Sequence, residues 1–277
     1  MSCTNEIPYG AGMPTDMVSS ILADNTYSPT KPSTKVEHGK TELQRAYEVL
    51  DFFISKNIPG TQTRVPIEFA IAVSGVWGAE SGIETWRYMK EEHDNGFAYK
   101  DKHAPNAKTF KYGGEVYYYD QANMMKFGYG KGVAQWSWDR VLKFRDWYRG
   151  SGGVTTPGVT MDDWGANITG TSVETQTAFA WYEMSQRTGE FLSVLKNHPH
   201  KSATGDPEGF KNNIIVFVDA VLRGFENGGV NKMASTKDID KYTWAGGYKG
   251  SMLTRVNRAL GIYEEIKNDS RYAPYLN

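Results

Sequence analysis

The sequence of 277 residues has a single cysteine, Cys3, which excludes an internal disulfide framework and a cysteine-rich zinc site. It has no apolar run approaching the roughly 18 to 20 residues of a membrane-spanning helix, and its start lacks the basic-then-apolar order of a secretion signal. The formal net charge of -1 gives no general attraction to nucleic acid. We therefore expect no membrane span, no nucleic-acid partner and no cofactor.

The metal ligands of a zinc site are also lacking. His93 and His103 lie within two residues of acidic side chains, but they do not have the i, i+4 helical spacing or the companion ligands of such a site. We expect no bound metal. Aromatic residues, by contrast, make up 13% of the chain. They fill cores and interfaces, and they also form stacking platforms for sugar rings.

The chain is expected to consist of an N-terminal arm and one folded domain. Residues 1–36 carry Pro, Gly, Ser and Thr at irregular spacing, which indicates an extended or flexible arm. Residues 37–277 show mostly helical periodicity, which predicts an α+β, mostly helical domain. A β-containing insert is expected over about 94–131, after the second helix.

Capping residues and apolar stripes locate the individual elements. Helices are predicted from Thr41 with a capping box to Gln44, from Pro66 to about Ser81, over about 137–149, over about 172–185 with a capping box from Thr171 to Glu174, from Asp206-Pro207, and over about 250–267. The helix from Pro66 is apolar nearly all round, so we expect it to be buried. Segments 109–111 and 115–119, joined by two glycines, indicate a small hairpin.

Glu80 is the candidate catalytic residue. Helical spacing puts it on one face with Val76 and Trp77, so its carboxyl is expected among apolar side chains. Desolvation raises the pKa of a carboxyl, and a glutamic acid that stays protonated near neutral pH can serve as a general acid. The alternative is that Glu80 ends its helix in solvent, with Gly82 as the C-terminal cap.

A glycine-dense turn leads into the helix over 137–149. It lacks the Gly-Lys-Ser/Thr ending and the preceding strand of a phosphate-binding loop, which excludes nucleotide binding. Gln135 could instead offer its amide to a sugar, and Trp136 or Trp138 could form a stacking wall, with core packing as the alternative for both Trp residues. Tyr129 and Tyr119 complete the candidate substrate-binding residues.

Two of these segments, in this order, resemble the phage tail lysozyme family of the lysozyme-like superfamily. They are Glu80-Ser81-Gly82 and, after the hairpin-containing insert, Gly-Tyr-Gly-Lys-Gly-Val-Ala-Gln-Trp at 128–136 with Arg140 after it. The resemblance covers about 41–268, and its later part lies in segments 173–176, 181–183 and 217–226, with Arg255 and Ala259. It implies a lysozyme-like fold and an N-acetylmuramidase that cleaves the β-1,4 bond between N-acetylmuramic acid and N-acetylglucosamine, with Glu80 as the acid.

A second catalytic carboxyl is not fixed by the resemblance, because the 55 residues from Glu80 to Gln135 are more than family members usually have. Glycosidases commonly pair two carboxyls. Asp120 is our candidate for the second one, with Asp101 and Glu115 as the other available partners, although a carboxylate in such a position is more often an ordinary surface charge.

The resemblance also implies a setting. The protein is expected in a phage virion, in the tail, where it degrades the host cell wall during genome entry. Its partners would be the peptidoglycan glycan strand and, through residues 1–36, other virion or tail proteins. Three alternatives stay open: a free endolysin, a lytic transglycosylase that uses the same Glu, and an inactive structural or glycan-binding tail component with this fold.

Overall fold

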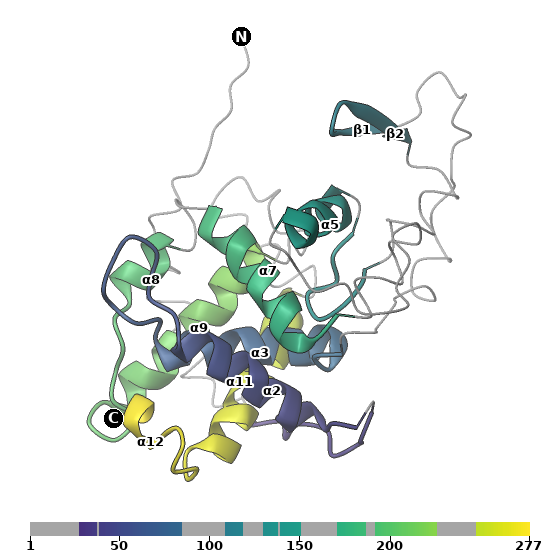
Figure 1. Cartoon of the computed structure of the whole chain (residues 1–277). Coiled ribbons are helices and arrows are strands. Elements are labelled where there is room, and N and C mark those ends of the chain that lie inside the picture. The colour runs from purple at the N-terminus through teal and green to yellow at the C-terminus, as the bar shows by residue number, and fades with distance from the viewer. Residues whose placement is uncertain are drawn as a thin grey trace. The chain divides into compact units, whose positions relative to one another are not determined.

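The computed structural model describes residues 28–84, 109–118, 130–150, 171–186, 192–225 and 248–277, apart from His38 and Trp138 (Figure 1). The described elements are α2 (Glu42–Ile54), α3 (Ile67–Ser81), β1 (Thr109–Tyr112), β2 (Glu115–Tyr118), α5 (Asp139–Gly150), α7 (Val173–Gln186), α8 (Ser193–Asn197), α9 (Pro207–Gly224), α11 (Tyr248–Ile266) and α12 (Ala273–Leu276). A mostly helical α+β class is thereby confirmed. None of these helices combines the length and the hydrophobicity needed to cross a bilayer.

The chain divides into two compact units. The first comprises residues 1–79 and 182–277, and the second comprises residues 80–181. The expected domain over 37–277 thus contains a boundary within α3, after Ala79, and another within α7, after Trp181.

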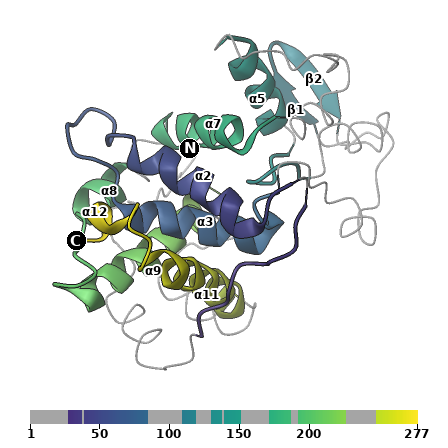
Figure 2. The ribbon, with the colours of Figure 1, turned by 60° about the horizontal axis from the view of Figure 1, so that its bottom comes forward.

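Four helices of the first unit surround an aromatic core. Phe53 of α2 and Phe69 of α3 meet edge to face with ring centroids 5.3 Å apart, and Phe69 meets Phe217 of α9 in the same way at 5.5 Å. Helix α9 packs in turn on α11 (Figure 2). At this contact the ring centroids of Phe210 and Tyr263 lie 5.0 Å apart. Such pairs contribute beyond the area they bury, so they fix how these helices pack.

Helix α3 runs through the middle of this core. Its residues from Ile67 to Gly78 are all buried, which confirms the burial predicted from its apolar sequence. A Cβ atom on Gly75 would lie only 2.5 Å from the Cβ of Ala259 in α11. Gly75 is therefore required for the close approach of the two helices, which explains a residue that disfavours helix formation by about 1 kcal/mol.

An extended segment, residues 28–36, lies along α11, and we call it the strap. The Thr30 N–H donates to the carbonyl of Asn257 at 2.9 Å, and Arg258 Nη1 donates to the carbonyl of Lys31 at 2.9 Å. The strap belongs to the N-terminal arm expected from the sequence, and these hydrogen bonds hold it against α11. Its backbone makes the contacts, which a search for side-chain periodicity does not detect. The earlier part of the arm lies outside the described residues.

Glu42 is buried where the strap meets α2 and α11. Its side chain is 1% exposed, and Oε2 accepts hydrogen bonds from the Ser33 N–H at 2.7 Å and from Arg258 Nη2 at 2.9 Å. Burial raises the pKa of this carboxyl, and the opposing effects of the Ser33 N–H, Arg258 and Arg45 do not cancel the rise.

This pKa shift predicts how stability depends on pH. The pKa of Glu42 in the folded protein lies above its ordinary value of 4.5, so the folded state binds this proton more tightly than the unfolded state does. The contribution of Glu42 is therefore fully present below the unfolded pKa and is lost as pH rises through the folded pKa. Relative to Glu42→Gln, the wild type should lose unfolding free energy as the pH rises above the ordinary carboxyl pKa of 4.5. Urea unfolding of both proteins measures this, and a gain by the wild type would contradict it.

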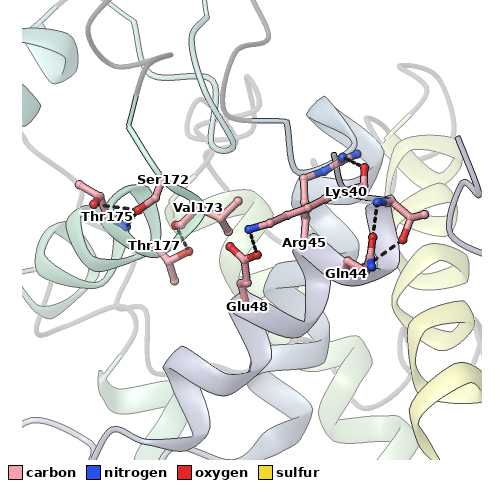
Figure 3. A network of polar contacts seen from close by, with 9 residues as sticks. Lys40, Gln44, Arg45, Glu48, Ser172, Val173, Thr175 and Thr177 are labelled. Atoms are coloured by element: carbon pink, nitrogen blue, oxygen red, sulfur yellow. Dashed lines mark hydrogen bonds and ion pairs between the residues drawn. The ribbon is translucent and has the colours of Figure 1, made fainter. Parts of the chain in front are cut away.

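Side-chain caps set the starts of two helices (Figure 3). In α2, the Thr41 N–H donates to Gln44 Oε1 at 2.7 Å and the Gln44 N–H donates to Thr41 Oγ1 at 3.2 Å, which confirms the predicted capping box. The capping box predicted from Thr171 in α7 is wrong. Ser172, one residue later, accepts the Thr175 N–H at 3.1 Å instead, and Thr171 is buried.

The second unit contains the predicted hairpin. β1 and β2 pair antiparallel, with Thr109 opposite Tyr118. Gly113 and Gly114 form the turn with positive φ angles of 59° and 84°, which glycine adopts without steric cost. β1 is one residue longer than expected, and the end predicted for β2 at Tyr119 lies outside the described residues.

Candidate active site

The second unit joins the end of α3 to the glycine-dense turn. Ser81 is fully buried, and its Oγ donates to the carbonyl of Val133 at 3.0 Å across 52 residues of sequence. Val133 lies within residues 130–136, which we call the glycine turn. One hydrogen bond thus connects the two segments that carry the family resemblance.

The glycine turn is closed on itself and fastened to α7. Lys131 and Trp136 exchange two backbone hydrogen bonds of 3.0 and 2.9 Å. The Val133 N–H donates to Oε1 of the buried Gln176 at 2.9 Å. Gly132 lies so close to this oxygen that a Cβ atom there would overlap it, and its φ of 70° favours glycine as well. The turn therefore has little freedom to move away from α7.

Backbone strain lies on both sides of the contact. Ile83 has a φ of 57° and Gln135 has a φ of 48°, and within the described part of the chain these are the two non-glycine residues with positive φ. This conformation is uncommon for any residue with a side chain and least favourable for a β-branched one such as Ile83. It costs about 1 to 3 kcal/mol per residue, and such residues cluster at functional sites. The strain therefore supports a site at this contact.

Glu80 precedes this contact by one residue, in the last turn of α3, and its side chain is half-buried. Gly82 follows with a φ of 66°, so it takes the left-handed conformation typical of a helix C-terminal cap. Glu80 is thus neither fully buried nor freely exposed at the end of its helix. Half-burial removes part of the hydration of a carboxyl, which is one condition for the general-acid role predicted for Glu80.

The side chain of Gln135 folds back onto the glycine turn. Its Nε2 donates to the carbonyl of Gly132 at 2.7 Å, and its buried Oε1 has no hydrogen-bond partner among the described residues. A Cβ atom on Gly130 would lie 2.6 Å from that oxygen. Contact with a sugar through Oε1 would require rotation of the side chain, and sugar binding by Gln135 stays a prediction.

Trp136 is a core residue. Its side chain is 0% exposed, and its ring centroid lies 5.3 Å from that of Phe144 in α5 and 5.5 Å from that of Phe179 in α7. The substrate-stacking role predicted for Trp136 is therefore wrong, because the two helices cover the ring that a sugar would need to contact.

Several predicted residues lie outside the described part of the chain: Asp120, Tyr119, Tyr129, Asp101, Trp138, His93 and His103. Glu115 is described and is exposed on β2, where it accepts a hydrogen bond from Tyr117 Oη at 2.8 Å. Burial and this bond raise the pKa of Tyr117. Among the described residues, no group of three or more His, Cys, Asp and Glu side chains is arranged to hold a metal ion.

The hairpin is anchored to α5 through another tyrosine. Tyr112 Oη donates to Asp146 Oδ2 at 2.7 Å. Burial and this hydrogen bond raise the pKa of Tyr112 to about 12, so the phenol remains a donor throughout the physiological range. The hairpin is therefore fixed to the helix that follows the glycine turn.

Sequence reasoning missed the role of Gln176, although the sequence contains a signal for it. Gln176 lies three residues after Val173 and four before Ala180, so it interrupts the apolar face of α7. A polar side chain in such a position is buried and needs a partner, which here is the N–H of Val133.

Replacing Ser81 by Ala should destabilise the second unit. The change removes the donor to the buried Val133 carbonyl, which we expect to lower the unfolding free energy by about 1 to 3 kcal/mol. Ser74→Ala is the matched control: this serine is equally buried in α3, but it donates at 2.9 Å to the carbonyl of Ala70 within its own helix. Urea unfolding compares the two variants, and an equal loss would show that the bond to Val133 has no special role.

The comparisons with known proteins provide no independent identification, since no protein-family model, curated protein or solved structure matches the chain. The contacts described above and the sequence resemblance are therefore what points to a function.

Proposed function

We propose that the chain is a lysozyme-like peptidoglycan hydrolase, an N-acetylmuramidase, with Glu80 as its general acid. The observation that carries the proposal is the hydrogen bond from Ser81 to Val133, since it joins the two segments that resemble the phage tail lysozyme family. The half-buried Glu80 lies directly beside it. Strain at Ile83 and Gln135, on either side of this bond, adds a second and independent argument.

In the proposed reaction, the protonated carboxyl of Glu80 donates its proton to the glycosidic oxygen as the bond to C1 of N-acetylmuramic acid breaks. The leaving sugar departs with this proton, and water adds its oxygen to C1. The proton that the water loses passes to the Glu80 carboxylate in a retaining reaction, which restores the acid, or to the second carboxylate in an inverting reaction, after which Glu80 is reprotonated from solvent. Asp120 is the proposed second carboxylate. It would act as the nucleophile at a separation of about 5 to 5.5 Å from Glu80, or as the base for water at about 6.5 to 9.5 Å.

The proposed setting is the tail of a phage virion, with activity in the host cell envelope and attachment to other tail proteins through residues 1–36. The family resemblance supports this setting. Mass spectrometry of purified virions tests it, because a free endolysin would be found in the lysate and not in the particles.

Product analysis tests the reaction. The purified chain is incubated with peptidoglycan, and the soluble fragments are examined by mass spectrometry. Fragments with free reducing ends support the muramidase, whereas 1,6-anhydro ends, one water lighter, would identify a lytic transglycosylase. Binding to the wall without release of fragments would favour an inactive structural or glycan-binding tail component.

A further inference from the structure

A second acidic side chain contacts the helix that carries Glu80. We infer that Glu42 is a positioning residue: its buried carboxyl, held by the strap, fixes the last turn of α3. The effect on catalysis rests on the function proposed for Glu80, whereas the effect on α3 does not.

Glu42 contacts α3 at Gly78. A Cβ atom on Gly78 would lie 2.8 Å from Oε1 of Glu42 and 3.2 Å from Cγ of Arg258. The carboxyl and the stem of Arg258 therefore occupy the space in which any other residue at Gly78 would place its side chain. Glu80 follows two residues later in the same helical turn, so a shift of α3 at Gly78 also moves Glu80.

The carboxyl of Glu42 connects separate parts of the chain. Its Oε2 accepts the Ser33 N–H from the strap and Nη2 of Arg258 from α11. Nη1 of the same Arg258 donates to the carbonyl of Lys31, also in the strap. Glu42 and Arg258 together therefore join the strap, α2 and α11 beside Gly78, where α3 has no side chain.

Stability alone does not account for the buried carboxyl of Glu42. Its Oε1 is buried and has no hydrogen-bond partner among the described residues. A buried charge with an unsatisfied oxygen contributes less to stability than a well-packed apolar side chain of similar size. What the carboxyl provides in addition is a defined geometry, since two donors fix Oε2 and thereby orient Oε1 toward Gly78.

The strap holds this arrangement from the other side. Gly261 of α11 lies so close to the carbonyl of Thr30 that a Cβ atom there would overlap it. The Thr30 N–H also donates to the carbonyl of Asn257. The strap thus packs against α11 at Gly261, where α11 has no side chain. Through its hydrogen bond to Glu42, the strap also fixes the carboxyl that contacts α3.

The test uses three variants of the full chain. Glu42→Ala removes the carboxyl, and Glu42→Gln keeps its shape and one acceptor oxygen. Lys31→Ala is the matched control, because it removes the exposed strap ion pair between Lys31 and Glu265, at 3.5 Å, and leaves the carboxyl intact. Each variant is studied by amide hydrogen exchange and by cleavage of soluble peptidoglycan fragments.

We expect Glu42→Ala to speed amide exchange in peptides that cover the last turn of α3. It should also lower kcat by roughly 10- to 100-fold with a smaller change in KM, because it displaces a catalytic group without removing it. Glu42→Gln should restore most of both properties, and Lys31→Ala should behave like the wild type. Unchanged exchange at the end of α3 in Glu42→Ala would overturn the inference, whatever the activity.

Two further outcomes are distinguishable. If the wild type cleaves no peptidoglycan, the proposed function fails, and exchange alone decides the positioning role: faster exchange in Glu42→Ala supports it and unchanged exchange overturns it. If Glu42→Ala does not fold, Arg258→Lys replaces it. A lysine keeps the charge but cannot bond both Glu42 and the Lys31 carbonyl as the forked guanidinium does. Faster exchange at the end of α3 in Arg258→Lys supports the positioning role, and unchanged exchange overturns it.

Discussion

Glu80→Gln should reduce peptidoglycan cleavage by about 10²- to 10⁴-fold, the usual contribution of general acid catalysis. Glutamine has nearly the same size but no proton to donate to a leaving oxygen. Because Glu80 is half-buried at the end of α3, the replacement should leave the fold intact. Release of reducing ends from purified peptidoglycan measures the loss, and thermal unfolding shows whether the melting temperature is retained.

Glu174→Gln is a suitable control for this experiment. Glu174 is exposed in the first turn of α7, in the same unit as Glu80. The Glu174→Gln variant loses an equivalent carboxyl, and we expect it to keep the activity of the wild type. Equal cleavage by Glu80→Gln and wild type would remove Glu80 from its proposed role. A lack of cleavage by all three proteins, with wall binding retained, would favour the inactive tail component.

Much of the helical framework could be predicted because its signals are local. Thr41 and Gln44 lie three residues apart and cap α2 as their spacing indicates. Gly113 and Gly114 supply the positive φ angles of a hairpin turn. The docking of the strap could not be predicted, since its bonds join backbone atoms of Thr30 and Asn257, which any sequence carries.

The candidate site was only partly predictable, because its contacts join residues that lie far apart in the sequence. Ser81 gives no sign in the sequence that its partner is the carbonyl of Val133, 52 residues away. The role of Trp136 likewise depends on distant neighbours, because Phe179 of α7 covers the indole from another part of the chain. The local spacing of residues could indicate Glu80 as a candidate catalytic residue, but long-range contacts determine which residues surround it.

The burial of Trp136 predicts a large loss of stability when the indole is removed. Trp136→Ala should lower the unfolding free energy by about 3 to 5 kcal/mol, because it removes a fully buried indole and leaves a cavity between Phe144 and Phe179. Their own rings lie 4.6 Å apart, so the pair is already in contact and can collapse into the cavity only in part. Urea unfolding measures the loss.

Trp136→Phe separates packing from sugar binding. Phenylalanine keeps an aromatic ring in the cluster, so this variant should lose much less stability than Trp136→Ala, and both folded variants should bind glycan fragments with the affinity of the wild type. The opposite pattern would be unchanged stability in Trp136→Ala with weakened glycan binding. That result would restore the stacking role that the structure contradicts. A ring that contacts substrate contributes little to the stability of the core, whereas a ring enclosed by α5 and α7 contributes mainly to that stability.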